Sequence, residues 1–554
     1  MTSDIAIYES DYPNPFLPEI GLFDYLFPSA QGISLHNPAS LSDDSVAFIE
    51  GHNGRQLKRG ELRDKALGLK TGLNAMGVGR GNVGCLWGLN GLEWIIAAYG
   101  LLAAGVTVTP ANASYDVHEI AHQVNDSGAN VVFVSPENLP QLVKAREQFK
   151  SPMPDSRIII LDTKGKYGFK SLYDHVGAPS EAEHFDGLES RATAVLCYSS
   201  GTTGLPKGVM TTHYNLTSQI LASQPLYPKF DLPQDSMLGF LPMSHIYGWI
   251  ALLIQPLTIG LRTIILPRFD EIQFLSCVQK YRCTHSLFVP PIVLLLVHSQ
   301  NVPRYDLSSL RIVSCGAAPL SGDLIDAFKK RFPQCTISQS YGMTETSPGI
   351  FLAPTEDAAA GHLGIGRLCP TYQARLVRSD GTDAPVGERG ELWVRGPCVM
   401  KGYHRNEAAT RGTMEPGGWL RTGDVLVRGE DGLWAVVDRV KELIKYKGFQ
   451  VAPAELEGIL LQHPAVIDAG VVGVQDDSQA TELPRAYIVT TSKEDPATVA
   501  KDVQAWVAAR VAHHKALRGG VLVIDAIPKS PSGKILRNIL RARAKEEFKP
   551  AGKL

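Results

Sequence analysis

The stretch TAVLCYSSGTTGLPKG, residues 193–208, holds the strongest structural signal in the chain. Its first six residues form a short apolar run, which is typical of a buried β-strand. The glycine-rich segment that follows allows the backbone to turn tightly and to come close to a ligand. Its hydroxyl and backbone N–H groups can hold phosphate oxygens, and Lys207 adds a positive charge. We therefore expect a strand that leads into a phosphate-binding loop, although composition alone does not distinguish this loop from a surface turn.

The sequence around this stretch has the alternating pattern of an α/β protein. Other short apolar runs are bounded by turn residues and followed by helix-like segments, which favours layered and mostly parallel sheets. These runs are residues 130–135, 157–162, 262–266 and 310–315. Residues 384–437 are rich in glycine and contain short strands, so we expect a small β-barrel-like subdomain there.

A chain of 554 residues is too long for one hydrophobic core. After Asp438 the sequence changes to a lysine-rich run, followed by a helix signature at 453–462. We expect an N-terminal α/β domain at 1–437, a hinge at 438–441 and a small mobile α+β lid domain at 442–554.

Composition excludes several classes of protein. A formal net charge of -2 gives no general attraction to nucleic acid, and no apolar run is long enough to span a membrane. The eight cysteines form no CxxC pair, which favours buried, reduced thiols. We expect a cytoplasmic protein. Peroxisomal location is the alternative, because residues 552–554 keep two letters of the Ser-Lys-Leu address.

The loop is not a Walker A loop, in which Ser or Thr follows Gly-Lys. Here Pro206 precedes Lys207 and Gly208 follows it, which disfavours a P-loop kinase or GTPase. The string YSSGTTGLPKG instead resembles the signature loop of the adenylate-forming superfamily, which includes acyl-CoA synthetases, firefly-type luciferases and peptide-synthetase adenylation domains. The resemblance implies that the phosphates of ATP are held by Ser199, Ser200, Gly201, Thr202, Thr203, Gly204 and Lys207.

Two further segments resemble the nucleotide site of the same family. In QSYGMTET, residues 339–346, the resemblance implies that Tyr341 stacks on adenine and that Thr344 donates to the α-phosphate. Glu345 would coordinate Mg²⁺, a hard cation suited to carboxylate and phosphate oxygens. In WLRTGD, residues 419–424, Asp424 would accept hydrogen bonds from the ribose hydroxyls. The resemblance adds four ATP-binding residues: Gln339, Ser340, Gly342 and Arg439.

The C-terminal part carries two more matching segments. DRVKELIKYKGFQV, residues 438–451, is most similar to plant 4-coumarate:CoA ligases and luciferases. PKSPSGKILR, residues 528–537, resembles the loop with the adenylation lysine, which maps to Lys534 and would stabilise negative charge developing on the α-phosphate. The resemblance implies further roles: the hinge for Asp438 and Lys441, adenylate contacts for Lys445 and Gln450, and CoA contacts for Arg268, Lys447 and Gly448.

The expected acyl pocket lies near residues 242–251 and 315–319. The resemblance makes His245 a catalytic gate beside the carboxylate. Trp249 and Ala251 favour an apolar slot for the acid. The other residues placed in this pocket are Tyr247, Gly316 and Ala317.

The resemblance implies an enzyme that converts a carboxylic acid and ATP to acyl-AMP and pyrophosphate, and then transfers the acyl group to CoA. The acid is expected to be aromatic or of medium length, and the enzyme a monomer or homodimer. Three alternatives stay open: a luciferase-like variant, an enzyme that loads a carrier protein, and an inactive nucleotide-binding regulator. No Asp lies between Phe240 and Pro267 to bind an α-ammonium group, which disfavours amino acid loading.

Overall fold

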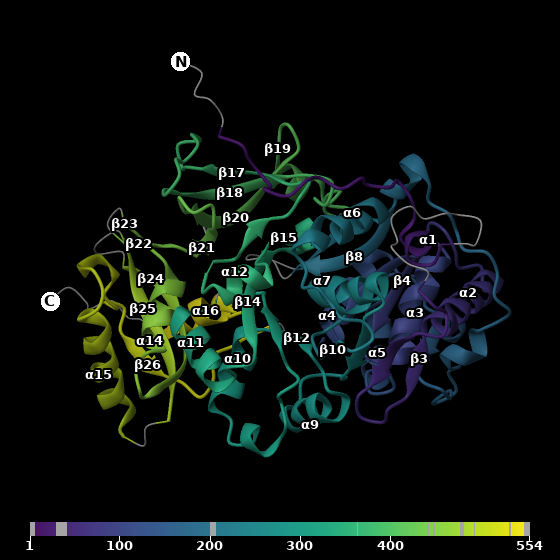
Figure 1. The fold of residues 1–554 in the computed structure, drawn as a ribbon, viewed down its shortest axis with the longest axis horizontal. Helices are drawn as coiled ribbons and strands as arrows, with labels where there is room; N and C mark the ends of the chain where they lie inside the picture. The colour runs from purple at the N-terminus through teal and green to yellow at the C-terminus, as the bar shows by residue number, and fades with distance from the viewer. Residues whose placement is uncertain are drawn as a thin grey trace.

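The computed structural model describes residues 6–28, 41–199, 206–318, 320–362, 364–439, 442–446, 449–476, 481–491, 494–530 and 533–547. Figure 1 shows a large N-terminal part, coloured purple to green, with a smaller C-terminal unit in yellow-green and yellow beside it. The chain is therefore a mixed α/β protein with two parts of unequal size, as the sequence predicts.

The first sheet of the N-terminal part has six strands in the order β7-β6-β4-β5-β8-β9. All neighbours are parallel except β8 and β9, which form an antiparallel hairpin around the glycine-rich segment. Parallel strands are covered on both faces and are accordingly apolar. The strands are β4 (Val83–Trp87), β5 (Thr107–Ala111), β6 (Val131–Val134), β7 (Ile158–Ile160), β8 (Thr193–Ser199) and β9 (Lys207–Thr212).

The second sheet has nine strands in the order β16-β15-β14-β13-β12-β10-β11-β2-β3. Its central strands, from β14 to β2, are parallel. Their carboxyl ends therefore meet at one edge of the sheet, where ligands bind in open α/β folds. The strands are β2 (Val46–Glu50), β3 (Gln56–Lys58), β10 (Ser236–Gly239), β11 (Arg262–Ile265), β12 (His285–Phe288), β13 (Ile312–Cys315), β14 (Thr336–Gly342), β15 (Gly349–Leu352) and β16 (Arg367–Leu368).

Helices cover these two sheets and form two main hydrophobic cores with them. Every residue of α3 (Leu92–Ala103) is buried, and all of them are uncharged except Glu93, which pairs with Arg55. The other helices of this part are α1 (Leu22–Leu26), α2 (Arg59–Ala75), α4 (Val117–Ser127), α5 (Leu139–Ala145), α6 (His213–Ser223), α7 (Ile246–Gly248), a π-helix (Trp249–Ile254), α8 (Gln255–Ile259), α9 (Glu271–Tyr281), α10 (Pro290–His298), α11 (Gly322–Arg331), α12 (Thr355–Ala359) and α13 (Glu407–Arg411).

A third, antiparallel sheet has the order β1-β17-β18-β20-β19, and β21 also pairs with β20. It contains the glycine-rich region 384–437, but two of its strands come from outside that range. The missed strand β1 has only two residues, which is too short for a periodic signal. The strands are β1 (Tyr8–Glu9), β17 (Gln373–Val377), β18 (Arg389–Arg395), β19 (Met414–Glu415), β20 (Trp419–Arg428) and β21 (Trp434–Arg439).

The C-terminal unit has its own hydrophobic core, whose buried members run from Ile444 to Ala544. Strand β21 still belongs to the third sheet and ends at Arg439, so the predicted hinge at 438–441 falls between the two cores; the domain boundaries themselves stay a prediction. The elements are β22 (Ile444–Tyr446), β23 (Phe449–Val451), β24 (Val466–Asp476), β25 (Thr481–Thr490), β26 (Val521–Val523), α14 (Pro453–Leu460), α15 (Pro496–Ala508) and α16 (Arg537–Glu547).

The structure also bears on the expectations about the cysteines and about membrane spans. All eight cysteines are buried and carry free thiols. Across the described ranges, no helix combines the length and the apolar character needed to cross a membrane.

The tightest helix contact in the first core is made by Gly72 on α2. A Cβ at this position would lie 1.8 Å from the carbonyl oxygen of His175. We expect Gly72→Ala to destabilise the N-terminal part by about 1–3 kcal/mol, because backbone atoms must move apart. Thermal unfolding measures this change. Asn74→Ala, an exposed change on the same helix, is the control and should stay within about 0.5 kcal/mol of the parent. An equal unfolding temperature for all three proteins would contradict the contact.

Candidate active site

One large cavity, of about 1090 Å³, lies between the three sheets of the N-terminal part and the C-terminal unit. Its wall is made of residues from distant parts of the sequence. The predicted site residues that line it are Ser199, Lys207, His245, Tyr247, Ala251, Gly316, Ala317, Gln339, Ser340, Tyr341, Gly342, Thr344, Glu345, Asp424 and Lys534. The structure therefore gathers the predicted phosphate, nucleotide, acyl and lysine positions around one space.

Strand order explains why these residues meet. Strands β13 and β14 are parallel neighbours, with Cys315 opposite Gln339. Gly316-Ala317, directly after β13, and Ser340–Glu345, at and beyond the end of β14, consequently lie side by side at the cavity. The Gln339 side chain fixes this arrangement, because its Oε1 accepts a hydrogen bond of 3.0 Å from the backbone N–H of Leu320.

The Tyr341 hydroxyl donates a hydrogen bond of 2.6 Å to Oδ2 of Asp424. These two residues are 83 positions apart and come from the second and third sheets. Asp424 is only 7% exposed, and its backbone N–H donates to Oγ1 of Thr422. A buried carboxylate in a cavity wall beside an aromatic ring offers hydrogen-bond acceptors next to a stacking surface, which suits a nucleoside.

Glu345 is held by a residue that the sequence analysis missed. The Tyr403 hydroxyl donates to Oε1 of Glu345 at 2.8 Å, and Nζ of Lys207 lies 4.4 Å from the centre of the Tyr403 ring. Burial and the neighbouring Glu345 carboxylate raise the pKa of Tyr403, so this hydroxyl stays protonated. A lone tyrosine in a loop carries no sequence signal of this role.

Glu345 also tests whether the site fits a divalent cation. Its carboxylate is 6% exposed and lines the cavity. It accepts a hydrogen bond from Tyr403, whose ring also contacts Lys207. Within the described residues, no group of three His, Cys, Asp or Glu side chains could hold a metal ion. Mg²⁺ commonly binds through one or two carboxylates and the phosphates of a substrate, so the residues present fit a magnesium ion that arrives with a nucleotide.

Lys534 reaches the cavity on a tight loop of the C-terminal unit. The Ser530 N–H donates to the carbonyl oxygen of Lys534 at 2.8 Å, and the Lys534 N–H donates to Oγ of Ser530 at 3.1 Å. Gly533 adopts a φ of 80°, and a Cβ there would lie 3.1 Å from the Pro291 ring on α10. The loop thus abuts the N-terminal part directly.

Arg537 connects this loop to the rest of the C-terminal unit and was also missed. Its guanidinium group donates to Glu442 at 2.6 Å and to both carboxylate oxygens of Glu457 at 2.6 and 2.8 Å. All three side chains are at most 11% exposed. Arg537 therefore joins the end of the Lys534 loop to α14 and to the residue that follows the predicted hinge.

His245 is neutral at pH 7. Burial, assisted by the positive charge of Lys534, lowers its pKa to about 4. Its Nδ1 accepts a hydrogen bond of 3.2 Å from the backbone N–H of Tyr247, which places the proton on Nε2. The side chain caps α7 and contributes an uncharged ring to the cavity wall.

The expectation that Trp249 lines the acyl slot is wrong. Trp249 is fully buried and packs edge-on against Trp94 at 5.8 Å, outside the cavity wall. Residues two apart point to opposite sides of a helix, so Ala251 can face the cavity only when Trp249 faces the core. Ile250 and Ala251 form the apolar wall instead.

Several predicted residues lie elsewhere or outside the described chain. Lys445 on β22 and Arg268 after β11 are exposed and do not line the cavity. Asp438 and Arg439 lie on β21 and Gln450 on β23, where only the backbone is described. The predicted site residues that lie outside the described ranges are Ser200, Gly201, Thr202, Thr203, Gly204, Lys441, Lys447 and Gly448.

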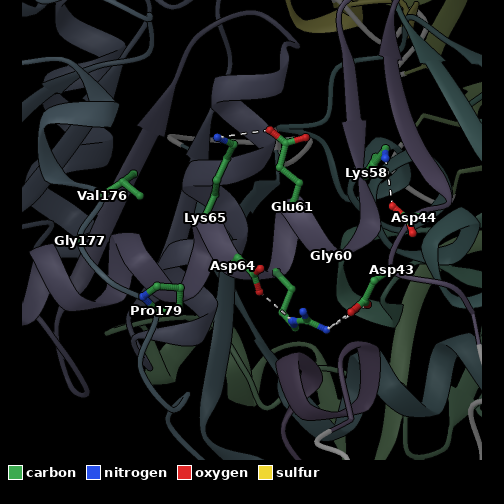
Figure 2. A pocket seen from close by; sticks show the side chains of 11 residues that line it. Asp43, Asp44, Lys58, Gly60, Glu61, Asp64, Lys65, Val176, Gly177 and Pro179 are labelled. Atoms are coloured by element: carbon green, nitrogen blue, oxygen red, sulfur yellow. Dashed lines mark hydrogen bonds and ion pairs between the residues drawn. The ribbon is translucent and has the colours of Figure 1, made fainter.

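A second, shallower hollow of about 540 Å³ lies where the start of α2 meets residues 176–179 (Figure 2). Its charges pair with one another: Arg63 contacts Asp43 at 2.8 Å, Lys58 contacts Asp44 at 3.0 Å and Lys65 contacts Glu61 at 3.3 Å. This hollow is an open surface whose charged side chains form salt bridges, and it is not part of the candidate active site.

The contact between Tyr341 and Asp424 gives a direct test of the nucleotide end. We expect Asp424→Ala to raise the KM for ATP by about 10-fold or more, because charge-assisted hydrogen bonds are lost. Tyr341→Phe keeps the ring and should have a smaller effect. Initial rates at varied ATP measure both changes. Glu430→Ala, an exposed change on the same hairpin, is the control; a KM that stays constant in the Asp424 variant would remove this residue from the nucleotide site.

Comparison with known proteins agrees with this geometry. The AMP-binding enzyme family model matches residues 36–404, and the model of its C-terminal domain matches residues 455–534. The chain is 34% identical to probable 4-coumarate–CoA ligase 1 of Dictyostelium discoideum, over 96% of this chain and 97% of that protein. It is 35% identical to luciferin 4-monooxygenase of Photinus pyralis, over 94% of each chain.

Among solved structures, o-succinylbenzoate CoA synthetase from Bacillus subtilis, in complex with its acyl-adenylate intermediate, superposes with a TM-score of 0.77. The two are 27% identical, and the match covers 93% of this chain and 97% of that one. A family model that spans most of the chain, relatives that match it nearly from end to end and one cavity that gathers the predicted nucleotide residues lead to the same conclusion: the chain belongs to the AMP-binding enzyme family.

Proposed function

We propose that this protein is an AMP-forming acid–CoA ligase. The observation that carries the proposal is the single cavity in which Tyr341 and Asp424, the gate position His245 and the lysine Lys534 share one wall. Two relatives support the second substrate, since one is named a 4-coumarate–CoA ligase and one solved neighbour is a CoA synthetase.

In the first step, a carboxylate oxygen of the acid attacks the α-phosphorus of ATP. A new P–O bond forms, the bond to the β-phosphate breaks, and pyrophosphate leaves with the electron pair. Negative charge grows on the α-phosphate and on the leaving group, and the ammonium group of Lys534 stabilises it. Thr344 donates to the same phosphate, while the neutral ring of His245 lies beside the carboxylate without adding charge.

The nucleotide is held on both sides of this reaction centre. Tyr341 stacks on adenine, Asp424 accepts from the ribose, and Lys207 with the residues of the glycine-rich loop contacts the phosphates. Mg²⁺ would be held by Glu345 and phosphate oxygens and would offset part of the phosphate charge. The assignments of Tyr341, Asp424, Lys207 and Glu345 rest on their positions in the cavity wall and on the matching motifs, and those of loop residues 200–204 rest on the motif alone.

In the second step, the thiol of CoA attacks the acyl carbon, a C–S bond forms, and AMP leaves as the C–O bond breaks. Lys445 is exposed in the present arrangement, whereas Lys534 lines the cavity. We propose that the C-terminal unit turns about 438–441 after the first step, so that the segment from Lys445 to Gln450 replaces the Lys534 loop. Arg268, Lys447 and Gly448 are assigned to CoA.

The acid is proposed to be aromatic or of medium chain length. A luciferase-like variant is the second candidate, and the 35% identical luciferin 4-monooxygenase favours it. The two differ in what consumes the adenylate: CoA in the ligase and oxygen in the variant. Location in the cytoplasm, with peroxisomes as the alternative, and a monomeric or dimeric state are part of the same proposal.

The role of Lys534 can be separated into two half-reactions. We expect Lys534→Ala to lower acid-dependent ATP–pyrophosphate exchange by on the order of 100-fold, because the developing charge loses its cation. The same variant should still convert supplied acyl-AMP and CoA to thioester and AMP. Radiolabelled pyrophosphate exchange measures the first reaction, and release of AMP measures the second.

Lys545→Ala is the matched control, since this lysine is exposed on α16 and lies outside the cavity. Equal loss of both half-reactions in the Lys534 variant would contradict the assigned role. Absence of exchange in the parent protein with every acid tested would instead support an inactive nucleotide-binding protein.

A further inference from the structure

Strand β20 contains a bulge at residues 422–424. Along the β18–β20 pair the register shifts between Glu391 and Trp393, so these three residues of β20 face Leu392 alone. Extra residues in one strand of an antiparallel pair bend that strand and re-aim the neighbouring side chains, and such bulges are common beside active sites. The last residue of this bulge is Asp424, which lines the cavity. The shape of the bulge therefore sets the direction of the Asp424 carboxylate.

Two residues of the bulge restrain its backbone. Gly423 has a φ of 74°, a left-handed conformation that favours glycine. The Thr422 hydroxyl donates to the carbonyl oxygen of Leu392 at 2.7 Å, and its oxygen accepts a hydrogen bond of 3.1 Å from the N–H of Asp424. Thr422 thus connects the two strands at the point where the register shifts.

Glu391 on β18 restrains the bulge from the other strand. Its Oε1 accepts a hydrogen bond of 3.2 Å from the N–H of Gly423. A residue inside a bulge loses its partner in the strand ladder, so a side-chain oxygen here replaces a backbone acceptor. Its Oε2 accepts from the indole N–H of Trp393 at 3.2 Å and from the guanidinium group of Arg421 at 3.3 Å. A carboxylate suits this place because it is acceptor-only and can take several donors.

The Glu391 carboxylate is itself held in place. Its side chain is 14% exposed and lines the same cavity as Asp424. The Trp393 ring, whose N–H donates to Glu391, is in contact with the guanidinium groups of Arg375 and Arg421, at 5.5 and 5.7 Å from its centre. With Oε2 fixed by two donors, Oε1 stays directed at the bulge.

We propose that Glu391 is a positioning residue for Asp424: it fixes the bulge at 422–424 so that the Asp424 carboxylate meets the ribose hydroxyls of the nucleotide. This inference rests on the proposed assignment of Asp424 to the ribose, and it adds a residue outside the predicted site. Glu391 acts through the Gly423 N–H, so its effect on nucleotide binding depends on a ribose that carries hydroxyl groups.

The test compares ATP with 2′-deoxyATP and 3′-deoxyATP in direct binding, measured by isothermal titration calorimetry in the presence of Mg²⁺. We expect the parent protein to bind ATP at least about 10-fold more tightly than at least one of the two deoxynucleotides, because a charge-assisted hydrogen bond to the carboxylate is lost. Asp424→Ala should remove this preference. Glu391→Ala should lower it by about 5-fold or more although Asp424 is present, and Glu391→Gln, which keeps an acceptor oxygen, should retain most of it.

Glu415→Ala is the matched control, since Glu415 also pairs with Arg421 and does not line the cavity. This variant should keep the full preference. If Glu391→Ala weakens the binding of all three nucleotides equally and leaves their ratios at the parent values, its role is merely structural and the proposal is overturned. Equal binding of the three nucleotides by the parent protein would also overturn it, because Asp424 would then not contact the ribose. The expected preferences without acid-dependent exchange would support the inference and contradict the ligase function.

Discussion

The contact between the Lys534 loop and the start of α10 holds the catalytic lysine, Lys534, at the cavity. The C-terminal unit contacts the N-terminal part where Gly533 packs against Pro291 and where Nε2 of Gln462 donates to Oδ2 of Asp323 at 2.6 Å. Both contacts are small: one is polar and the other involves a glycine. Each part, in contrast, has a large apolar core of its own. An arrangement held in this way can be exchanged for another without unfolding either part.

Charge is distributed unevenly in the cavity, because the C-terminal unit lies against the N-terminal part. Lys207, Glu345 and Asp424 lie on the side that the nucleotide motifs mark, and Lys534 enters from the C-terminal unit. Tyr247, Ile250 and Ala251, which also line the cavity, bear no formal charge. His245 also lines the cavity, and it stays neutral because burial and the positive charge of Lys534 lower its pKa. A charged reaction centre therefore borders a neutral acyl pocket.

Much of this architecture could be predicted from the sequence. The apolar runs at 193–198 and 310–315 became β8 and β13, since fully buried parallel strands require continuous apolar residues. The phosphate-loop and nucleotide segments could be recognised because their chemistry demands particular residues in a fixed order. Strand β1 could not be predicted, since two residues have no periodicity.

Contacts between side chains that are distant in the sequence could not be predicted either. Tyr403 contacts Glu345 over 58 positions and Arg537 contacts Glu442 over 95, and neither pair has a local signature. The orientation of Trp249 depends on the π-helix that follows α7, and no pattern in the sequence predicts this π-helix.

We propose that the present arrangement serves adenylate formation and that it must change before CoA can react. Cysteines introduced at the exposed positions Asp323 and Gln462 can be joined by a short reducible bismaleimide, since the eight native thiols are buried. The account predicts that the cross-linked protein retains acid-dependent ATP–pyrophosphate exchange, loses thioester formation from supplied acyl-AMP and CoA, and regains it on reduction. Thioester formation at the parent rate in the cross-linked protein would contradict the account.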